Sequence, residues 1–275
     1  MTTPAPRLQS IETASTFLFV PATRPDRFEK ATLSGAGQII LDLEDAVAPA
    51  DKDQARHHVA EWLGTHVGST VRINGSGTAW HADDVRMVAD RDCAVMLPKA
   101  ESAEELKVLA RVATRGLLGL VETARGLLSS STLADACTRL AFGNVDLAAE
   151  LGLDPAHRQV LAPLRMQLVV SAAAAQKPAP VDGVTTSLRD TDALREDARA
   201  ARRQGFTGKL CIHPAQVSIS EDALRPTDDE IAWATSVVAV RREGATAIDG
   251  QMIDEPVVSR ARALLLRSST PRQAT

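Results

Sequence analysis

The chain has 275 residues, of which 44% are hydrophobic and 24% are charged, and its formal net charge is −4 at pH 7. A chain of this length suits one large barrel or two small domains and can bury a sizeable core. The net negative charge and the lack of a Lys/Arg block argue against nucleic-acid binding. No stretch has the apolar length of a membrane span, and the N-terminal residues lack the pattern of a signal peptide.

The three cysteines, Cys93, Cys137 and Cys211, are widely spaced and lie within apolar runs. Their odd number and spacing favour reduced thiols in the core of a protein of the cytoplasm, with a nucleophile or a metal ligand as the less favoured alternative. Together with the composition, this predicts a soluble cytoplasmic protein.

Eight short apolar runs follow one another along the chain, and most are continuous, as is typical of parallel strands buried on both faces. They are TFLFVP (16–21), QIILDLED (38–45), TVRIN (70–74), AVMLPKA (94–100), LGLVETA (118–124), RLAFGNVD (139–146), PVDGVTT (180–186) and KLCIHP (209–214). The stretches between them have helical spacing, with Ser102 and Asp190 as expected N-caps and Gly205 as a C-terminal stop. This repetition predicts a (β/α)8 TIM barrel over residues 1–225. An open doubly wound sheet is the alternative, but no glycine fingerprint follows the first run.

The pattern changes after residue 225. Residues 225–244 predict a helix with Thr227 as its N-cap and Glu230 completing a capping box. A short segment (245–256) and a last helix (257–269) follow. Residues 226–275 are too few for a second domain, so we expect a C-terminal helical arm or lid that packs on the barrel or on a neighbouring subunit.

Polar side chains gather at the expected C-terminal ends of the runs, which meet on one face of a barrel where barrel enzymes have their active sites. They are Asp42, Glu44, Asp45, Arg72, Asn74, Lys99, Glu122, Asn144, Asp146, Asp182 and His213. Several acids on one face repel one another unless a cation or a proton joins them. Oxygen ligands without cysteine or paired histidine fit Mg²⁺, and Glu122 and Asp146 end adjacent runs. Each acid could instead cap the next helix, and Arg72 could be a structural ion-pair partner.

Nine motifs resemble, in order, those of the citrate lyase β-subunit-like group of the HpcH/HpaI aldolase and malyl-CoA lyase superfamily, over about residues 16 to 260. They are FVPATRPDRFEKA, ILDLEDAV, VRIN, VMLPKAES, LVETARG, FGNVDLAAELG, DGVTT, GKLCIHPAQV and GQMIDEPV. The resemblance implies a (β/α)8 barrel assembled as a homotrimer or hexamer. Many relatives read Gly-Ala-Glu-Asp where this chain has Gly143-Asn144-Val145-Asp146, so the acid before Asp146 is replaced by Val145.

The resemblance also implies roles for single residues. Glu122 and Asp146 match the family's Mg²⁺ ligands, and Arg72 matches the contact to the substrate oxygens and the thioester carbonyl. Arg24 and Lys30 fall where the family holds the phosphates of coenzyme A. Asp254 matches an acid/base that relatives deliver to a neighbouring subunit's site. Lys99 is a further substrate-binding candidate, and Glu44 and Asp45 are candidates for orienting Arg72 or relaying protons.

These residues predict a Mg²⁺-dependent carbon–carbon lyase that reversibly cleaves a 3-hydroxyacyl-CoA such as malyl- or citramalyl-CoA into acetyl-CoA and an α-keto acid or glyoxylate. One alternative is a citrate lyase β subunit that acts on a citryl thioester of an acyl carrier protein. Another is a non-catalytic acyl-CoA-binding subunit. The sequence does not choose between the possible acyl groups, because a methyl or methylene changes binding by only about 1–3 kcal/mol.

Overall fold

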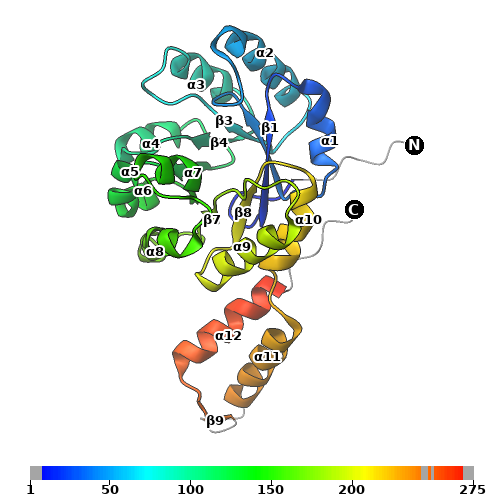
Figure 1. The fold of residues 1–275 in the computed structure, drawn as a ribbon, viewed down its shortest axis with the longest axis vertical. Coiled ribbons are helices and arrows are strands. Elements are labelled where there is room, and N and C mark those ends of the chain that lie inside the picture. Colours follow the sequence, from blue (N-terminus) through cyan, green and yellow to red (C-terminus); the bar gives the residue numbers. More distant parts are fainter. Residues whose placement is uncertain (1–7, 243–246, 249–250, 269–275) are drawn as a thin grey trace, which may run out of the picture. The chain divides into compact units, whose positions relative to one another are not determined.

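Eight parallel strands close into a barrel in which each strand pairs with its neighbours in sequence and β8 pairs with β1 (Figure 1). The computed structural model describes residues 8–242, 247–248 and 251–268. The strands are β1 (Thr16–Pro21), β2 (Gln38–Asp42), β3 (Thr70–Arg72), β4 (Ala94–Leu97), β5 (Leu117–Val121), β6 (Arg139–Phe142), β7 (Val181–Asp182) and β8 (Gly208–Cys211). This confirms the predicted (β/α)8 barrel and excludes the open sheet.

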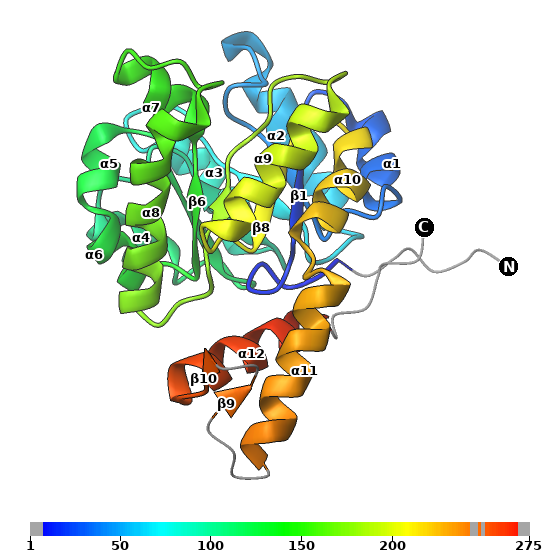
Figure 2. The same cartoon turned by 60° about the horizontal axis from the view of Figure 1, so that its bottom comes forward.

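Helices follow the strands and surround the barrel (Figure 2). Between β1 and β5 they are η1 (Pro25–Arg27), α1 (Phe28–Thr32), η2 (Pro49–Asp51), α2 (Lys52–Leu63), α3 (His81–Ala89) and α4 (Ala103–Leu109). After β5 they are α5 (Ala124–Leu128), α6 (Ser130–Ala136), α7 (Asn144–Glu150), α8 (Arg158–Ala174), α9 (Thr191–Arg203) and α10 (Ala215–Leu224). Among the described residues, no helix is long and apolar enough to cross a membrane.

Local signals in the sequence set the predicted helix ends. Ser102 Oγ accepts a hydrogen bond from the Glu105 backbone N–H, and Asp190 Oδ1 accepts one from that of Ala193. Both side chains satisfy an amide that has no partner within its helix. Gly205 has a φ of 100°, the left-handed conformation that ends a helix at little cost for glycine. The predicted caps and stop are therefore confirmed.

Apolar side chains fill the barrel and separate it from the helices. Inside the barrel lie Phe17, Ile40, Met96, Leu118 and Leu120, all of them buried. A second, larger set of buried side chains lies between the strands and the surrounding helices. The strands are thus buried on both faces, which explains their continuous rather than alternating apolar sequence.

Contacts divide the described part of the chain into two compact units, with the boundary between Leu224 and Arg225. The second contains α11 (Asp228–Arg242), the short antiparallel strands β9 (Ala247–Ile248) and β10 (Gln251–Met252), and α12 (Glu255–Ser268). The predicted capping box is confirmed, since the Thr227 N–H donates to Glu230 Oε2 and the Glu230 N–H donates to Thr227 Oγ1. Residues 243–246, 249–250 and 269–275 of the expected arm lie outside the described residues. That the arm completes a neighbouring subunit's site stays a prediction.

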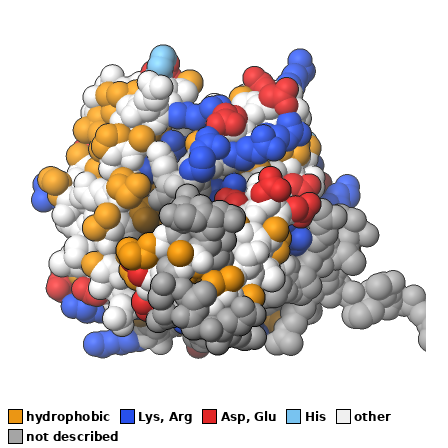
Figure 3. Space-filling view, turned by 90° about the horizontal axis from the view of Figure 1, so that it is seen from below, with side chains coloured by type: hydrophobic (Ala, Val, Ile, Leu, Met, Phe, Trp, Pro, Cys, Tyr) orange, Lys and Arg blue, Asp and Glu red, His pale blue; other side chains and the backbone are white. Residues whose placement is uncertain are grey.

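Charged side chains on the outer surface lie close to opposite charges. Figure 3 shows Lys and Arg side chains gathered on one face, with Asp and Glu beside them. On α9, Arg203 pairs with Glu196 and Arg195 with Asp192. Such exposed pairs contribute little to stability, but they reduce the positive charge that α9 presents to solvent.

Candidate active site

A cavity of about 440 Å³ lies at the C-terminal ends of the barrel strands. It brings together six of the polar residues that the sequence places at those ends: Asp42, Asp45, Arg72, Glu122, Asn144 and Asp146. The remaining lining residues are Phe19, Pro21, Ala46, Leu120, Phe142, Gly143, Val145, Val184, Leu210 and Ile212. Glu44 and Lys99 do not line this cavity, but each contacts a residue that does.

Arg72, the last residue of β3, is held by acids from the end of β2. Its Nε and Nη2 donate to the two carboxylate oxygens of Asp42 at 2.7 and 2.6 Å. Its Nη1 lies 3.0 Å from Glu44 Oε2 and 3.5 Å from Asp45 Oδ2. Burial alone would lower the pKa of Arg72, but these acids raise it above its ordinary value. The guanidinium therefore stays charged and fixed in direction, and Asp42 orients it more closely than Glu44 or Asp45 does.

Glu122 follows β5 and is 3% exposed. Its Oε1 accepts a hydrogen bond of 2.8 Å from the Lys99 backbone N–H. Burial, and then the charges of Glu44 and Asp146, raise the pKa of Glu122 to about 8. A buried carboxyl that lies near other acids gains stability as an anion when a cation joins it. The chemistry of this donor set therefore fits a divalent cation.

Asp146 lines the same cavity from the first turn of α7 rather than from the end of a strand as expected. The strand β6 ends at Phe142, so Gly143 leads directly into the helix that carries Asp146. Among the described residues, no three His, Cys, Asp or Glu side chains are grouped as a metal site. Two carboxylates, completed by water and substrate, fit Mg²⁺.

Gly143 fixes the spacing between β5 and β6 at this point. A Cβ added there would lie 2.2 Å from Glu122 Cβ and 2.8 Å from Glu122 Oε2. Gly183 after β7 is similar, because an added Cβ would lie 2.0 Å from Asn144 Oδ1. Asn144 in turn accepts from the Val184 N–H and donates to the Val184 carbonyl. Glycine at both positions allows the first turn of α7, which carries Asp146, to lie against the neighbouring strands.

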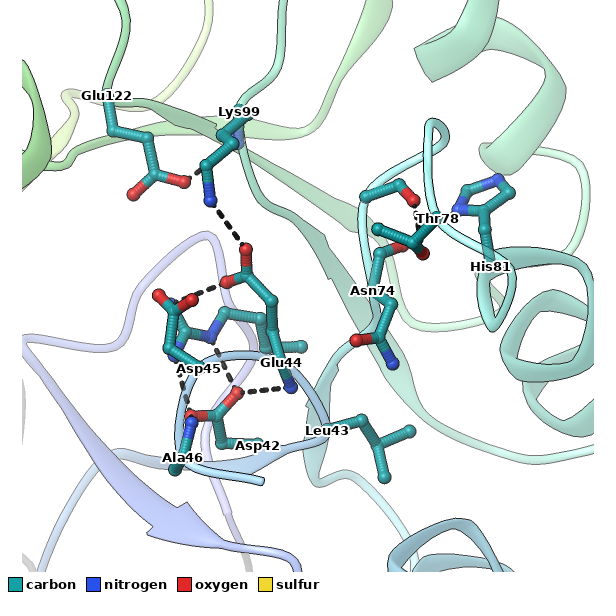
Figure 4. A network of polar contacts seen from close by, with 12 residues as sticks. Asp42, Leu43, Glu44, Asp45, Ala46, Asn74, Thr78, His81, Lys99 and Glu122 are labelled. Atoms are coloured by element: carbon teal, nitrogen blue, oxygen red, sulfur yellow. Dashed lines mark hydrogen bonds and ion pairs between the residues drawn. The ribbon is translucent and has the colours of Figure 1, made fainter. Parts of the chain in front are cut away.

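Lys99 connects the acids of two strands, as Figure 4 shows. Its backbone N–H holds Glu122, and its Nζ donates to Glu44 Oε1 at 2.8 Å. Its φ of 46° lies in the left-handed region, which costs a residue with a side chain about 1–3 kcal/mol. The predicted substrate contact of Lys99 stays a prediction, because its ammonium, although half-exposed, pairs with Glu44 here.

Lys52, at the start of α2, holds the acidic segment at the end of β2, residues 42–45. The sequence analysis did not single it out. Its buried Nζ donates to the carbonyls of Leu43 and Glu44 and to Asn74 Oδ1, at 2.6–2.7 Å. Asn74 is held by Asp84, which accepts from both its backbone N–H and its Nδ2. The available signal was a lysine directly after a proline-initiated turn, but the sequence shows neither that it is buried nor where its ammonium points.

Other predicted residues lie elsewhere. Arg24, in the loop after β1, pairs with Asp26, and Lys30 is exposed on α1; neither lines the cavity. Asp254 is exposed in the C-terminal unit, where its Oδ1 accepts from the Val257 N–H at the start of α12. His213 is exposed, and its Nδ1 accepts from the Ala215 N–H.

Asp182 departs from the expectation for a residue on the open face. It is fully buried between Lys209 and Arg165, at 2.9 and 2.8 Å. The three cysteines are likewise buried, and burial raises the pKa of Cys93 and Cys137 to about 12 and that of Cys211 to about 11. Protonated, enclosed thiols are poor nucleophiles and metal ligands, which supports the interpretation of core thiols.

A family model described as HpcH/HpaI aldolase/citrate lyase matches residues 15–214, the part of the chain that forms nearly the whole barrel. The chain belongs to this family. It is 40% identical over 263 residues to a citrate lyase subunit beta-like protein of Mycobacterium tuberculosis, covering 92% of this chain and 94% of that one. It is 33% identical over 265 residues to a (3S)-malyl-CoA thioesterase of Cereibacter sphaeroides, covering 91% and 93%. The resemblance of the nine motifs is thereby confirmed.

The crystal structure of a relative contains bound ligands. The crystal structure of the protein CitE from Mycobacterium tuberculosis, in complex with magnesium, acetoacetate and coenzyme A, superposes with a TM-score of 0.81. The two chains are 37% identical, and the match covers 94% of this chain and 99% of that one. The family is of the lyase and aldolase type, although its members include proteins named as thioesterases.

Proposed function

We propose that this protein is a Mg²⁺-dependent carbon–carbon lyase that cleaves, or in reverse forms, a 3-hydroxyacyl-CoA such as malyl- or citramalyl-CoA. The observation that carries the proposal is the buried Glu122 carboxyl, which shares one cavity with Asp146 and with the oriented Arg72. The magnesium and coenzyme A held by the solved relative support the same chemistry. Glu122 and Asp146 would hold the cation, which supplies Lewis acidity to the substrate's oxygens.

The chain's own residues suit the remaining steps. The bond between the carbinol carbon and the carbon next to the thioester carbonyl breaks once the hydroxyl proton leaves, and its electrons form the enolate of acetyl-CoA. Arg72 would stabilise the enolate oxygen, and its hydrogen bonds to Asp42, which fix its direction, support this role. Asp45 lines the cavity and is a candidate for the proton relay, with Glu44 beside Arg72. Asp254 would protonate the enolate carbon.

We propose further that Asp254 acts on the site of a neighbouring copy in a homotrimer or hexamer. The test mixes two inactive variants, Asp254→Asn and Glu122→Gln. If the acid comes from another copy, some sites in mixed oligomers combine an intact arm with an intact cavity, so activity returns on mixing. Activity that does not return, or a monomer in light scattering, would refute this arrangement.

The activity itself is tested by incubating the purified chain with malyl-CoA and citramalyl-CoA, first with Mg²⁺ and then with EDTA. Appearance of acetyl-CoA and keto acid that EDTA abolishes is the expected result, and Glu122→Gln should lose the response to Mg²⁺. Release of free coenzyme A with the intact hydroxy acid would instead indicate a thioesterase, the activity named for one relative.

A second candidate is favoured by another relative, the citrate lyase subunit beta of Leuconostoc mesenteroides subsp. cremoris, which is 33% identical over 278 residues and 91% covered in both chains. A β subunit of that kind would act on a citryl thioester of an acyl carrier protein. No cleavage of free coenzyme A thioesters, together with cleavage of the carrier-bound thioester, would move the proposal to this candidate.

A further inference from the structure

The helix that carries Asp146 is short, and its first turn is attached on two sides. Helix α7 (Asn144–Glu150) follows β6 with only Gly143 between them, and Figure 2 shows it at the end of the barrel. Because Asp146 lies in the first turn of α7, its carboxylate moves with that turn. The contacts of this turn therefore decide where one of the two proposed cation ligands lies.

On the side of β5, main-chain bonds fix the start of α7. Within the described barrel β5 and β6 pair at four positions, and beyond them the Gly143 N–H donates to the Val121 carbonyl at 2.9 Å. At the other end of α7, Glu150 Oε2 accepts a hydrogen bond of 3.0 Å from the Ala124 N–H, two residues after Glu122. This side of α7 therefore stays joined to β5 whatever the side chain at position 144.

On the side of β7, a side chain takes the place of main-chain bonds. Strand β7 is two residues long, and in the described barrel its ladder with β6 has a single pair, Ala141 with Val181. Beyond that pair, Asn144 Oδ1 accepts from the Val184 N–H at 2.9 Å, and Asn144 Nδ2 donates to the Val184 carbonyl at 3.0 Å. A carboxamide suits this place because, like a peptide group, it offers both a donor and an acceptor. Asn144 thus joins the first turn of α7 to the loop after β7.

The Asn144 carboxamide is enclosed. A Cβ added at Gly183 would lie 2.0 Å from Asn144 Oδ1 and 2.6 Å from its Cγ, so the amide fills the space that a side chain at Gly183 would need. Asn144 is 5% exposed. Its removal would leave the N–H and carbonyl of Val184 without these partners in a place that water reaches poorly.

The loop after β7 is itself fixed, so the amide bonds to a rigid partner. Buried Lys209 on β8 donates to the Gly183 carbonyl at 2.7 Å. Gln216 on α10 donates to the Thr185 carbonyl and accepts from the Ile212 N–H, both at 2.9 Å. These contacts join the loop to β8 and α10, whereas Asn144 joins it to α7.

We infer that Asn144 is a positioning residue for the cation site: its carboxamide fixes the first turn of α7 to the loop after β7 and so holds the Asp146 carboxylate in the cavity that it shares with Glu122. The inference rests on the proposed function, in which Glu122 and Asp146 hold the cation. It extends that function to a residue whose amide already bonds to the main chain. Groups that fix a metal ligand in place typically change metal affinity by about 10- to 100-fold.

The test measures metal affinity without any substrate. Mn²⁺ takes the same oxygen ligands as Mg²⁺, and the electron paramagnetic resonance signal of free Mn²⁺ gives its dissociation constant. We expect Asn144→Ala to bind Mn²⁺ about 10- to 100-fold more weakly than the wild type, and Mg²⁺ to raise its Tm less. Its kcat should approach the wild-type value at saturating Mg²⁺, because Asp146 is displaced rather than removed. Mn²⁺ binding equal to that of the wild type overturns the inference.

Gln216→Ala is the matched control. Gln216 is 3% exposed, and its amide also joins main-chain groups of two segments, but neither segment carries a proposed cation ligand. We expect it to lower the Tm measured in EDTA, as Asn144→Ala does, and to leave the dissociation constant of Mn²⁺ unchanged. If both variants weaken Mn²⁺ binding alike, lost stability explains the effect and the inference is wrong.

A second variant perturbs the same contact while Asn144 stays in place. Gly183→Ala adds a methyl where the carboxamide lies, so it should displace the amide and weaken Mn²⁺ binding as Asn144→Ala does. In the double variant the two effects should be less than additive, because the amide that the methyl displaces is already absent. Fully additive effects would show that Asn144 does not act through this contact.

The metal measurements separate failure of the inference from failure of the proposed function. If Mn²⁺ binding depends on Asn144 as expected but no thioester is cleaved, the proposed reaction is wrong and the positioning role stands. If the thioesters are cleaved but Asn144→Ala binds Mn²⁺ like the wild type, the inference is wrong and the lyase stands. A wild-type protein that binds no Mn²⁺ refutes both.

Discussion

Gly143→Ala tests whether the position of Glu122 decides metal binding. The φ of −90° at Gly143 is open to alanine, so the effect of the change is steric rather than conformational. The new Cβ would lie 2.2 Å from Glu122 Cβ, whereas carbon atoms normally approach to about 3.5–4.0 Å. The ends of β5 and β6 must therefore move apart by roughly 1 Å or more. Overpacking of this kind costs about 1–3 kcal/mol of stability, and a displacement of about 1 Å in a catalytic group costs about 100-fold in rate.

The assay measures thermal unfolding with and without Mg²⁺, and kcat/KM for the preferred thioester. We expect Gly143→Ala to lose most of the Mg²⁺-dependent rise in Tm and about 100-fold in kcat/KM. Gly75→Ala is the matched control, because a Cβ at Gly75 would have nothing within 4 Å. If the two variants behave alike in both measurements, the reasoning from close approach is refuted.

Three further changes test other parts of the molecule. Asp254→Asn should lower kcat by about 10²- to 10⁴-fold and leave the Tm unchanged, because asparagine caps a helix as well as aspartate; equal kcat would remove Asp254 from catalysis. Lys52→Met should lower the free energy of unfolding, measured with denaturant, by about 2–4 kcal/mol, because buried acceptors lose their donor. It should also lower kcat with little change in KM, because residues 42–45 lose the contact that holds them. Asp182→Asn should lower the free energy of unfolding by about 3–5 kcal/mol, because Lys209 and Arg165 would keep buried charges without an anionic partner. Those two cations hold the pKa of Asp182 below its ordinary value despite its burial, so its stabilisation is present above about pH 4. The stabilisation is lost as the pH falls further in the wild type but not in Asp182→Asn, and unfolding curves from pH 3 to pH 7 measure the difference.

The barrel could be predicted because buried parallel strands have a direct signature. Each apolar run overlaps a strand, and the caps at Ser102 and Asp190 depend on contacts within three residues. Apart from β1, which spans its whole run, the strands are shorter than the runs. The run at 38–45 ends as β2 at Asp42, because the acids after it turn toward Arg72 instead of continuing the ladder.

The site could be predicted only as far as its acids and Arg72. Convergence at one face follows from the topology of a barrel, and so the meeting of Glu122 with Asp146 was predictable. Long-range contacts were not: Lys52 and Asn74 are 22 residues apart, and nothing local shows that they meet. The left-handed turn at Lys99 also has no signal in its residue type, because lysine seldom adopts it.

The buried cysteines provide an internal reporter of unfolding. All three belong to the barrel unit, and the unit that follows residue 224 contains none. A thiol reagent can reach them only when the barrel opens, so the rate of labelling in native buffer measures how often it does so. Changes confined to the C-terminal unit should leave that rate unaltered, whereas magnesium and a bound thioester should slow it in proportion to their occupancy. The chain thus carries its own probe, with no added dye, for separating events in the barrel from events in the arm.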